Sequence, residues 1–162
     1  VTFTRTQFET ALAASVRRIV DAQKLEGVKI APRKVQTNST EIIYYVYTGY
    51  ENVWIMIFSS IEPRTGRSRE NGEDAVRFNL VDSTAVPQGF KAAMLLEKQP
   101  HMKRIETWRK NLDARLERLF AEAHSFPKCQ CGSVKVERTK KGTSQTFLGC
   151  ANWHAIHKPV AV

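Results

Sequence analysis

Three short segments rich in β-branched and aromatic residues follow one another in the centre of the chain, and they limit its fold more than any other feature. They read EIIYYVYT (Glu41–Thr48), VWIMIFSSI (Val53–Ile61) and AVRFNLVD (Ala75–Asp82). This composition is typical of strands. The turn sequence GYEN joins the first two, and both connections are too short for parallel crossovers, so we predict a meander of three antiparallel strands.

The third segment alternates apolar and polar residues. Val76, Phe78 and Leu80 are separated by Arg77 and Asn79. Because successive side chains on a strand point to opposite faces, this pattern predicts a sheet with one covered face and one face in contact with water.

An amphipathic helix is predicted before the meander. From Thr6 to about Lys24, apolar residues recur at helical spacing, and Gly27 is placed to end the helix. The next segment contains Pro32, which favours an edge strand or an extended linker.

A second, longer helix is predicted after the meander, from His101 to Ala123, with charged residues of both signs on its outer face. Before it, Lys91–Lys98 is expected to form a helical turn that Pro100 interrupts. The fold class expected is therefore α+β: an antiparallel three- to four-stranded sheet flanked by an N-terminal and a long C-terminal helix.

The composition of the chain changes at the sequence SFPK. We expect a core domain over residues 1–125 and a small module over residues 126–162, which contains all three cysteines of the chain. A segment of this size buries too little apolar surface to fold by itself, so it needs a cross-link or must lie on the main domain.

The cysteines point to one structural Zn²⁺ in this module. Cys129 and Cys131 form a first turn, Gly132 lets the backbone fold back, and Cys150 begins a second turn after two strand-like stretches. Zn²⁺ takes four tetrahedral Cys or His ligands, so a histidine must complete the set. The candidates are His157 and His154, which both follow Cys150.

This module resembles the zinc ribbons at the C-terminus of type IA DNA topoisomerases. Their pattern runs Cys-Pro-x-Cys-Gly, basic strands, then Phe-x-Gly-Cys-x-x-Tyr-Pro-x-Cys, and its second half is matched in order by Phe147, Gly149, Cys150 and Trp153. The first turn departs from it by being Cys-x-Cys. The last cysteine is missing, with His157 one residue past its place and His154 two residues before it, so we favour His157 as the fourth ligand and keep His154 as the alternative. The resemblance implies contact with single-stranded DNA.

The charge balance independently favours a polyanionic partner. The 162 residues include 25 Lys and Arg against 16 Asp and Glu, a net charge of +9, which favours binding to nucleic acid. In the module we expect phosphate contacts from basic residues and base stacking from aromatic ones. These candidates are Lys135, Arg138, Lys140, Lys141, Phe147 and Trp153.

A second basic segment lies in the core, where Arg64, Arg67 and Arg69 follow the second strand. Two interpretations stay open: a flexible loop that follows a nucleic-acid backbone, or a charged turn whose arginines pair with nearby carboxylates. Those carboxylates are Glu70, Glu73 and Asp74. Together with Glu51, Glu62 and Asp82 they are also available to a metal-dependent nuclease, but the usual spacing of Asp and Glu-x-Lys on consecutive strands is absent.

The order of elements in the core is loosely similar to that of Rad52-type single-strand annealing proteins. We therefore expect a sequence-independent DNA-binding protein that prefers single strands and acts in recombination, repair or replication. A homo-oligomer is compatible with this expectation, and a binding protein fits it better than an enzyme does. The alternatives are a nuclease or other DNA-processing enzyme, and a zinc-ribbon adaptor that binds protein. RNA is not excluded as the ligand.

No apolar run approaches the roughly 18 residues of a membrane helix, and no secretory signal is recognisable. Three cysteines are also a poor basis for a disulfide framework. These features predict an intracellular protein without a membrane partner, in the cytoplasm, nucleoid or nucleus.

Overall fold

A computed structural model describes residues 2–33, 41–69, 76–82, 93–94, 103–104 and 107–151. Its elements in chain order are α1 (Arg5–Gln23), β1 (Lys29–Arg33), β2 (Ile43–Tyr47), β3 (Val53–Phe58), β4 (Arg77–Asp82), β5 (Ala93–Met94), β6 (Lys103–Arg104), α2 (Trp108–Ser125), β7 (Lys135–Thr139) and β8 (Thr146–Cys150).

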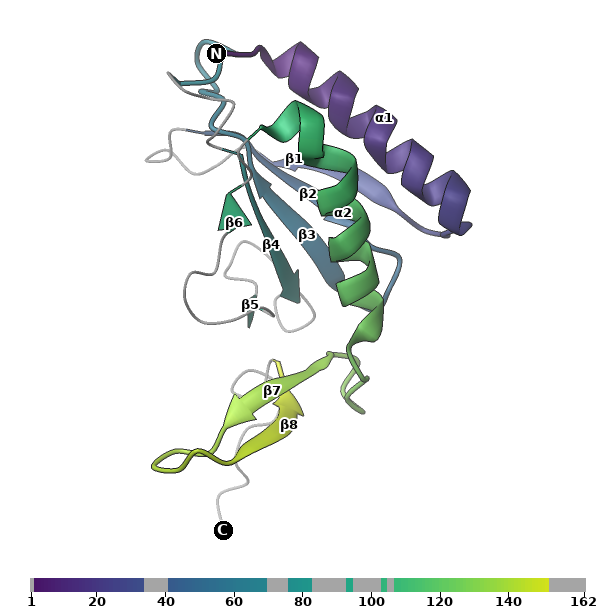
Figure 1. Ribbon diagram of the computed structural model, residues 1–162, viewed down its shortest axis with the longest axis vertical. Coiled ribbons are helices and arrows are strands. Elements are labelled where there is room, and N and C mark those ends of the chain that lie inside the picture. Colours follow the sequence, from purple (N-terminus) through teal and green to yellow (C-terminus); the bar gives the residue numbers. More distant parts are fainter. Residues whose placement is uncertain are drawn as a thin grey trace.

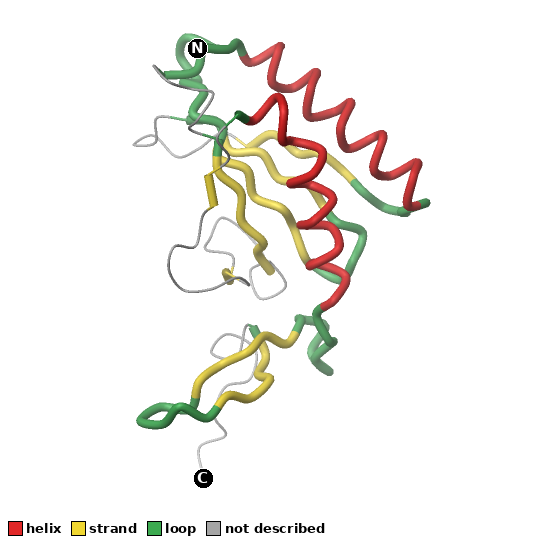
Figure 2. The backbone as a smooth tube through the Cα atoms, in the orientation of Figure 1, coloured by secondary structure: helices red, strands yellow, loops and turns green. Residues whose placement is uncertain are grey.

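The predicted α+β class is confirmed (Figures 1 and 2). The main sheet has the order β1-β2-β3-β4-β5 with antiparallel neighbours, and β6 also pairs with β4. The strand β1, which contains Pro32, lies at the edge of the sheet, as the sequence suggested. A separate antiparallel hairpin, β7–β8, follows α2.

Both helices cover one face of the main sheet (Figure 1) and enclose the hydrophobic core with it. Among the described residues the largest buried side chain is Trp108, at the start of α2, and its ring centroid lies 5.0 Å from that of Phe3 and 5.1 Å from that of Phe8. From β2 and β3, Tyr44 and Ile55 reach the same cluster. The two predicted apolar stripes are therefore the surfaces that the helices bury.

The first helix spans Arg5–Gln23, in agreement with the predicted range of Thr6 to about Lys24. Thr4 caps it: its hydroxyl accepts a hydrogen bond from the Gln7 amide, and the Gln7 side chain accepts one from the Thr4 amide. The helix ends at Lys24, which takes the left-handed conformation at φ 52°. The prediction that Gly27 ends it is wrong, because Lys24 already supplies the reversal.

The second helix starts later than predicted. It begins at Trp108 and not at His101, because Lys103–Arg104 form a strand that pairs with β4. The helical turn predicted over Lys91–Lys98 is also wrong at its two described residues, Ala93–Met94, which pair with the other end of β4. In both places hydrogen bonding to the sheet edge overrides the local helical preference.

The second face of the sheet is not open to water along β4, contrary to the predicted alternation. Asn79 and Val81, on the side away from the helices, are fully buried, as is Asp82 at the end of the strand. The structure also places β4 between β3 and the short strands β5 and β6, so β4 is an interior strand and not the edge of a three-stranded meander.

The C-terminal module is packed against the core domain. Val134, Val136 and Ala151 belong to the same hydrophobic cluster as the helices and the main sheet. The buried Asp82 carboxylate accepts a hydrogen bond from the Val134 amide at 3.0 Å, and Lys128 forms an ion pair with Glu51 at 2.6 Å. These contacts fix the module at the end of the sheet where β4 finishes and β3 begins.

No helix in the described part of the chain is both long enough and apolar enough to cross a membrane.

Candidate metal centre and basic surfaces

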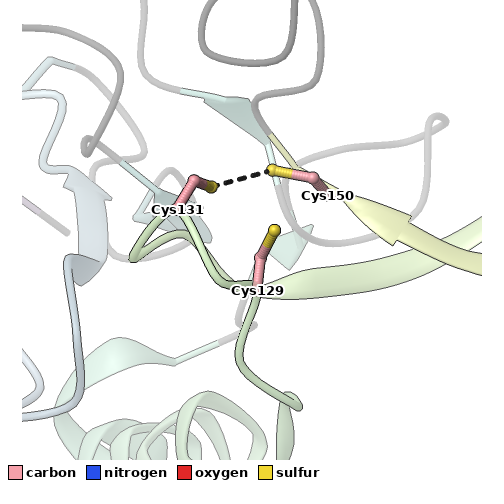
Figure 3. Close-up of side chains that lie close together, drawn as sticks. All are labelled: Cys129, Cys131 and Cys150. Atoms are coloured by element: carbon pink, nitrogen blue, oxygen red, sulfur yellow. Dashed lines mark hydrogen bonds between the residues drawn. The ribbon is translucent and has the colours of Figure 1, made fainter.

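The three cysteines come together at the base of the β7–β8 hairpin (Figure 3). Their sulfur atoms all lie within 4.8 Å of one another, and no disulfide joins them. The Cys131 and Cys150 sulfurs are 3.5 Å apart. The sequence-based prediction that two distant turns bring these side chains together is therefore confirmed.

The first turn owes its shape to its backbone hydrogen bonds. The Cys129 amide donates to the Ser133 carbonyl at 2.7 Å, and the Gly132 amide donates back to the Cys129 carbonyl at 3.1 Å. Gly132 has a backbone φ of 88°, a conformation that residues other than glycine rarely adopt. The turn thereby directs the Cys129 and Cys131 side chains toward the same point (Figure 3).

The third sulfur is placed by the strand register. Cys150 is the last residue of β8 and lies opposite Lys135, the first residue of β7, so it returns to the turn that precedes β7. Next to it, Gly149 leaves room for the Arg138 side chain: a Cβ there would lie 3.0 Å from the Arg138 Cδ. The Arg138 guanidinium then donates hydrogen bonds to the Cys150 and Ala151 carbonyls at 2.9 and 3.0 Å.

The geometry of the sulfurs suits a tetrahedral metal. With Zn–S distances of about 2.3 Å, the sulfurs of a tetrahedral site are about 3.8 Å apart, which is within the spread seen here. Three thiols at this separation can hold a metal ion. Within the described part of the chain they are also the sole group of three or more Cys, His, Asp or Glu side chains arranged in this way.

The surroundings favour the thiolate form of Cys131, the form that binds metals. Burial alone raises the pKa of this thiol, but hydrogen bonds from the Ser133 backbone and side chain, and from Cys129 and Cys150, outweigh burial. Together they lower the pKa to about 6.

The predicted fourth ligand lies outside the described residues, whether it is His157 or His154, and so does Trp153. The histidine of α2, His124, lies within them, but its Nε2 is 3.0 Å from the Thr48 carbonyl oxygen and it is not part of the cysteine cluster.

The hairpin beyond the cysteines carries basic and aromatic side chains at its surface. Lys140 and Lys141 are exposed in the turn, and Lys135 is half-buried. Phe147 is 50% exposed. Arg138 lies opposite Phe147, but its hydrogen bonds to the end of β8 give it a structural role that the sequence did not indicate.

The second predicted basic segment is an ordered turn over its described part. The Ser68 amide donates to the Phe3 carbonyl at 2.8 Å, and Arg67 lies opposite Thr4 in an isolated bridge. The Arg64 and Arg67 side chains are exposed, whereas Arg69 is half-buried. The carboxylates expected to pair with them, Glu70, Glu73 and Asp74, lie outside the described residues.

The two predicted basic surfaces lie at opposite ends of the main sheet. The arginine turn follows the end of β3, whereas the C-terminal module contacts Glu51, just before β3, and Asp82, the last residue of β4. Figure 1 shows this separation along the long axis of the molecule. The sequence did not indicate that Asp82 joins the module to the sheet. The one feature that could have indicated this role is the position of an acidic residue at the end of an apolar strand.

Comparison with protein-family models, with curated protein sequences and with solved structures finds no match. Any functional assignment for this chain therefore depends on its own residues and their geometry.

Proposed function

We propose that this protein binds DNA without reading its sequence, prefers single strands, and uses a zinc-stabilised hairpin as one of its contact surfaces. The observation that carries this proposal is the hairpin itself. The three cysteines anchor its base, and the exposed Lys140, Lys141 and Phe147 lie beyond them. Cations attract phosphates regardless of sequence, and an exposed aromatic ring offers a stacking face to any unpaired base.

In this proposal the ion is a structural Zn²⁺ held by Cys129, Cys131, Cys150 and a histidine, His157 or alternatively His154. A structural ion of this kind contributes folding energy to a module that is too small for a full core of its own. The resemblance to topoisomerase zinc ribbons supports the same role. Single-strand annealing in recombination, repair or replication is the most specific form of the proposal, and it rests on the order of elements in the core alone.

The first experiment combines zinc analysis with binding of fluorescent oligonucleotides. We expect about one zinc per chain and a steep loss of oligo(dT) affinity as salt rises, with weaker binding to a duplex of equal length. The variant Lys140→Ala/Lys141→Ala is expected to flatten the slope of log K against log salt by about 0.7 for each phosphate that it no longer neutralises. Arg17→Ala/Lys110→Ala removes two exposed charges from the helices and is the matched control.

Other outcomes identify the competing functions. Cleavage of the oligonucleotide in Mg²⁺ that Glu73→Gln or Asp74→Asn abolishes would indicate a nuclease. If the purified protein contains no metal and binds neither oligonucleotide, the proposal is contradicted. Binding to another protein that does not depend on salt would favour the adaptor function.

A further inference from the structure

The main sheet has a face opposite α1 and α2 on which the strand register arranges residues in three rows. Each row crosses β1 to β4 and alternates with the positions that face the core. The rows are Lys29, Tyr47, Trp54 and Val81; Ala31, Tyr45, Met56 and Asn79; and Arg33, Ile43, Phe58 and Arg77.

Aromatic side chains are concentrated on this face over β2 and β3. Tyr45, Tyr47, Trp54 and Phe58 are all half-buried, unlike the aromatic residues of the core, which are fully buried. The ring of Trp54 lies 4.9 Å from that of Tyr47 and 6.4 Å from that of Tyr45. The three rings therefore form one continuous aromatic patch. Partly exposed aromatic residues on a sheet are a known platform for stacking the bases of single strands.

The charge of this face suits a polyanion. Among the described side chains of these rows, two are basic, Lys29 and Arg77, and none is acidic. Lys29 is exposed, and Arg77 lies over the Phe58 ring at 5.4 Å while forming an ion pair with Glu41. Two copies of the chain that met through this face would bring two net charges of +9 together, which disfavours a second copy as its occupant.

The aromatic patch also lies between the two basic surfaces described above. Phe58 ends β3 on the side of the exposed Arg64 and Arg67, and Trp54 lies near the start of β3, where Glu51 and Asp82 hold the C-terminal module. Met56, Asn79 and Val81 of the same rows are buried, so the accessible part of this face is the aromatic patch of β2 and β3, between the two basic surfaces along the direction of β3.

We propose that the aromatic face of the main sheet, centred on Tyr45, Tyr47 and Trp54, stacks the bases of a single nucleic-acid strand whose phosphates contact the arginine turn at one end and the zinc hairpin at the other. This inference rests on the proposed function and adds to it the surface that holds the bases. It makes the core domain, and not the hairpin alone, a part of the binding site.

The test measures oligo(dT) binding by fluorescence anisotropy at several salt concentrations for the wild type and for Trp54→Ala and Trp54→Phe. Loss of a stacking ring costs about 1–3 kcal/mol, so Trp54→Ala is expected to bind about 5- to 150-fold more weakly. Its slope of log K against log salt is expected to match the wild type, because no charge is removed. Trp54→Phe keeps a ring and is expected to bind within a few-fold of the wild type.

The outcomes separate this inference from the proposed function. If wild type binds oligo(dT) and Lys140→Ala/Lys141→Ala weakens binding but Trp54→Ala does not, the aromatic face is not the base-binding surface and the proposed function stands. If wild type does not bind at all, both fail. If Trp54→Ala converts a dimer into a monomer in light scattering, the face binds a second copy and the inference is overturned.

Cross-linking of the wild type decides the question if Trp54→Ala does not fold. An oligonucleotide containing 5-bromouracil is irradiated on the protein, and the linked peptide is identified by mass spectrometry. Links to residues 43–58 are the expected result. Links confined to residues 135–150 would overturn the inference.

Discussion

The hydrogen bond between Asp82 and Val134 is predicted to hold the C-terminal module on the core, and the substitution Asp82→Ala removes it. Asp82 lies at the end of β4, and its Oδ2 accepts the Val134 amide proton at 3.0 Å. Both residues are fully buried, so water cannot replace the missing acceptor.

The expected cost follows from this burial. A hydrogen bond to a carboxylate contributes about 1.5–3 kcal/mol, and removing the acceptor leaves the amide without a partner in a site closed to solvent. The shorter side chain of Ala also leaves a small void. We therefore expect Asp82→Ala to lower the free energy of unfolding by about 2–4 kcal/mol. Asp82→Asn keeps an oxygen in place and is expected to cost about 1 kcal/mol.

Urea unfolding followed by circular dichroism gives these free energies, and hydrogen exchange locates the effect. Faster exchange is expected at the Val134 and Val136 amides, with little change in the middle of α1. Glu137→Ala, an exposed substitution on β7, is the control and is expected to stay within about 0.5 kcal/mol of the wild type. A cost for Asp82→Ala no larger than that of this control, with unchanged exchange at Val134, would refute the argument.

Three further predictions concern the core, an ion pair and the metal. Trp108→Ala is expected to lower the free energy of unfolding by about 3–5 kcal/mol in urea titration, because a fully buried indole is removed; a cost below about 1 kcal/mol would contradict the described core. Hydrogen bonding to Arg18 lowers the pKa of Asp113, so this pair stabilises the folded protein above the ordinary carboxyl pKa, and the stabilisation disappears as pH falls through the lowered value. The stability difference between wild type and Arg18→Ala should therefore be larger at pH 7 than at pH 2; a difference independent of pH would count against it. Cys131→Ser is expected to reduce the zinc content from about one per chain to near zero by atomic absorption, while an unchanged content would place the ion elsewhere.

Much of the secondary structure is predictable because its signal is local. The β-branched run in Ile43–Tyr47, the GYEN turn and the apolar stripe of α1 each depend on residues that are neighbours in the sequence. The approach of Cys129, Cys131 and Cys150 is predictable for a related reason. Two tight turns at the base of a hairpin place their ligands together once the strands between them pair in register.

The errors occur where distant segments decide the outcome. The local pattern predicts a helix over Lys103–Arg104, but the backbone there pairs with β4, a partner more than twenty positions away in the sequence. The alternation along β4 likewise indicates a face in contact with water, yet Asn79 and Val81 are buried in the folded chain. Local propensity contains no information on which edge of a strand receives a partner.

Some features of the candidate site are likewise predictable from the sequence, and others depend on the tertiary structure. The sequence by itself determined the basic character of the chain, the three central strands between two helices and the set of three cysteines, because composition, periodicity and ligand spacing are local properties. Only the tertiary structure decided that Arg138 bonds the end of β8, that Asp82 joins the module to the sheet, and that the aromatic rings of β2 and β3 lie between two basic surfaces. Those relations depend on strand register and on the packing of segments far apart in the sequence, which only the folded chain brings together.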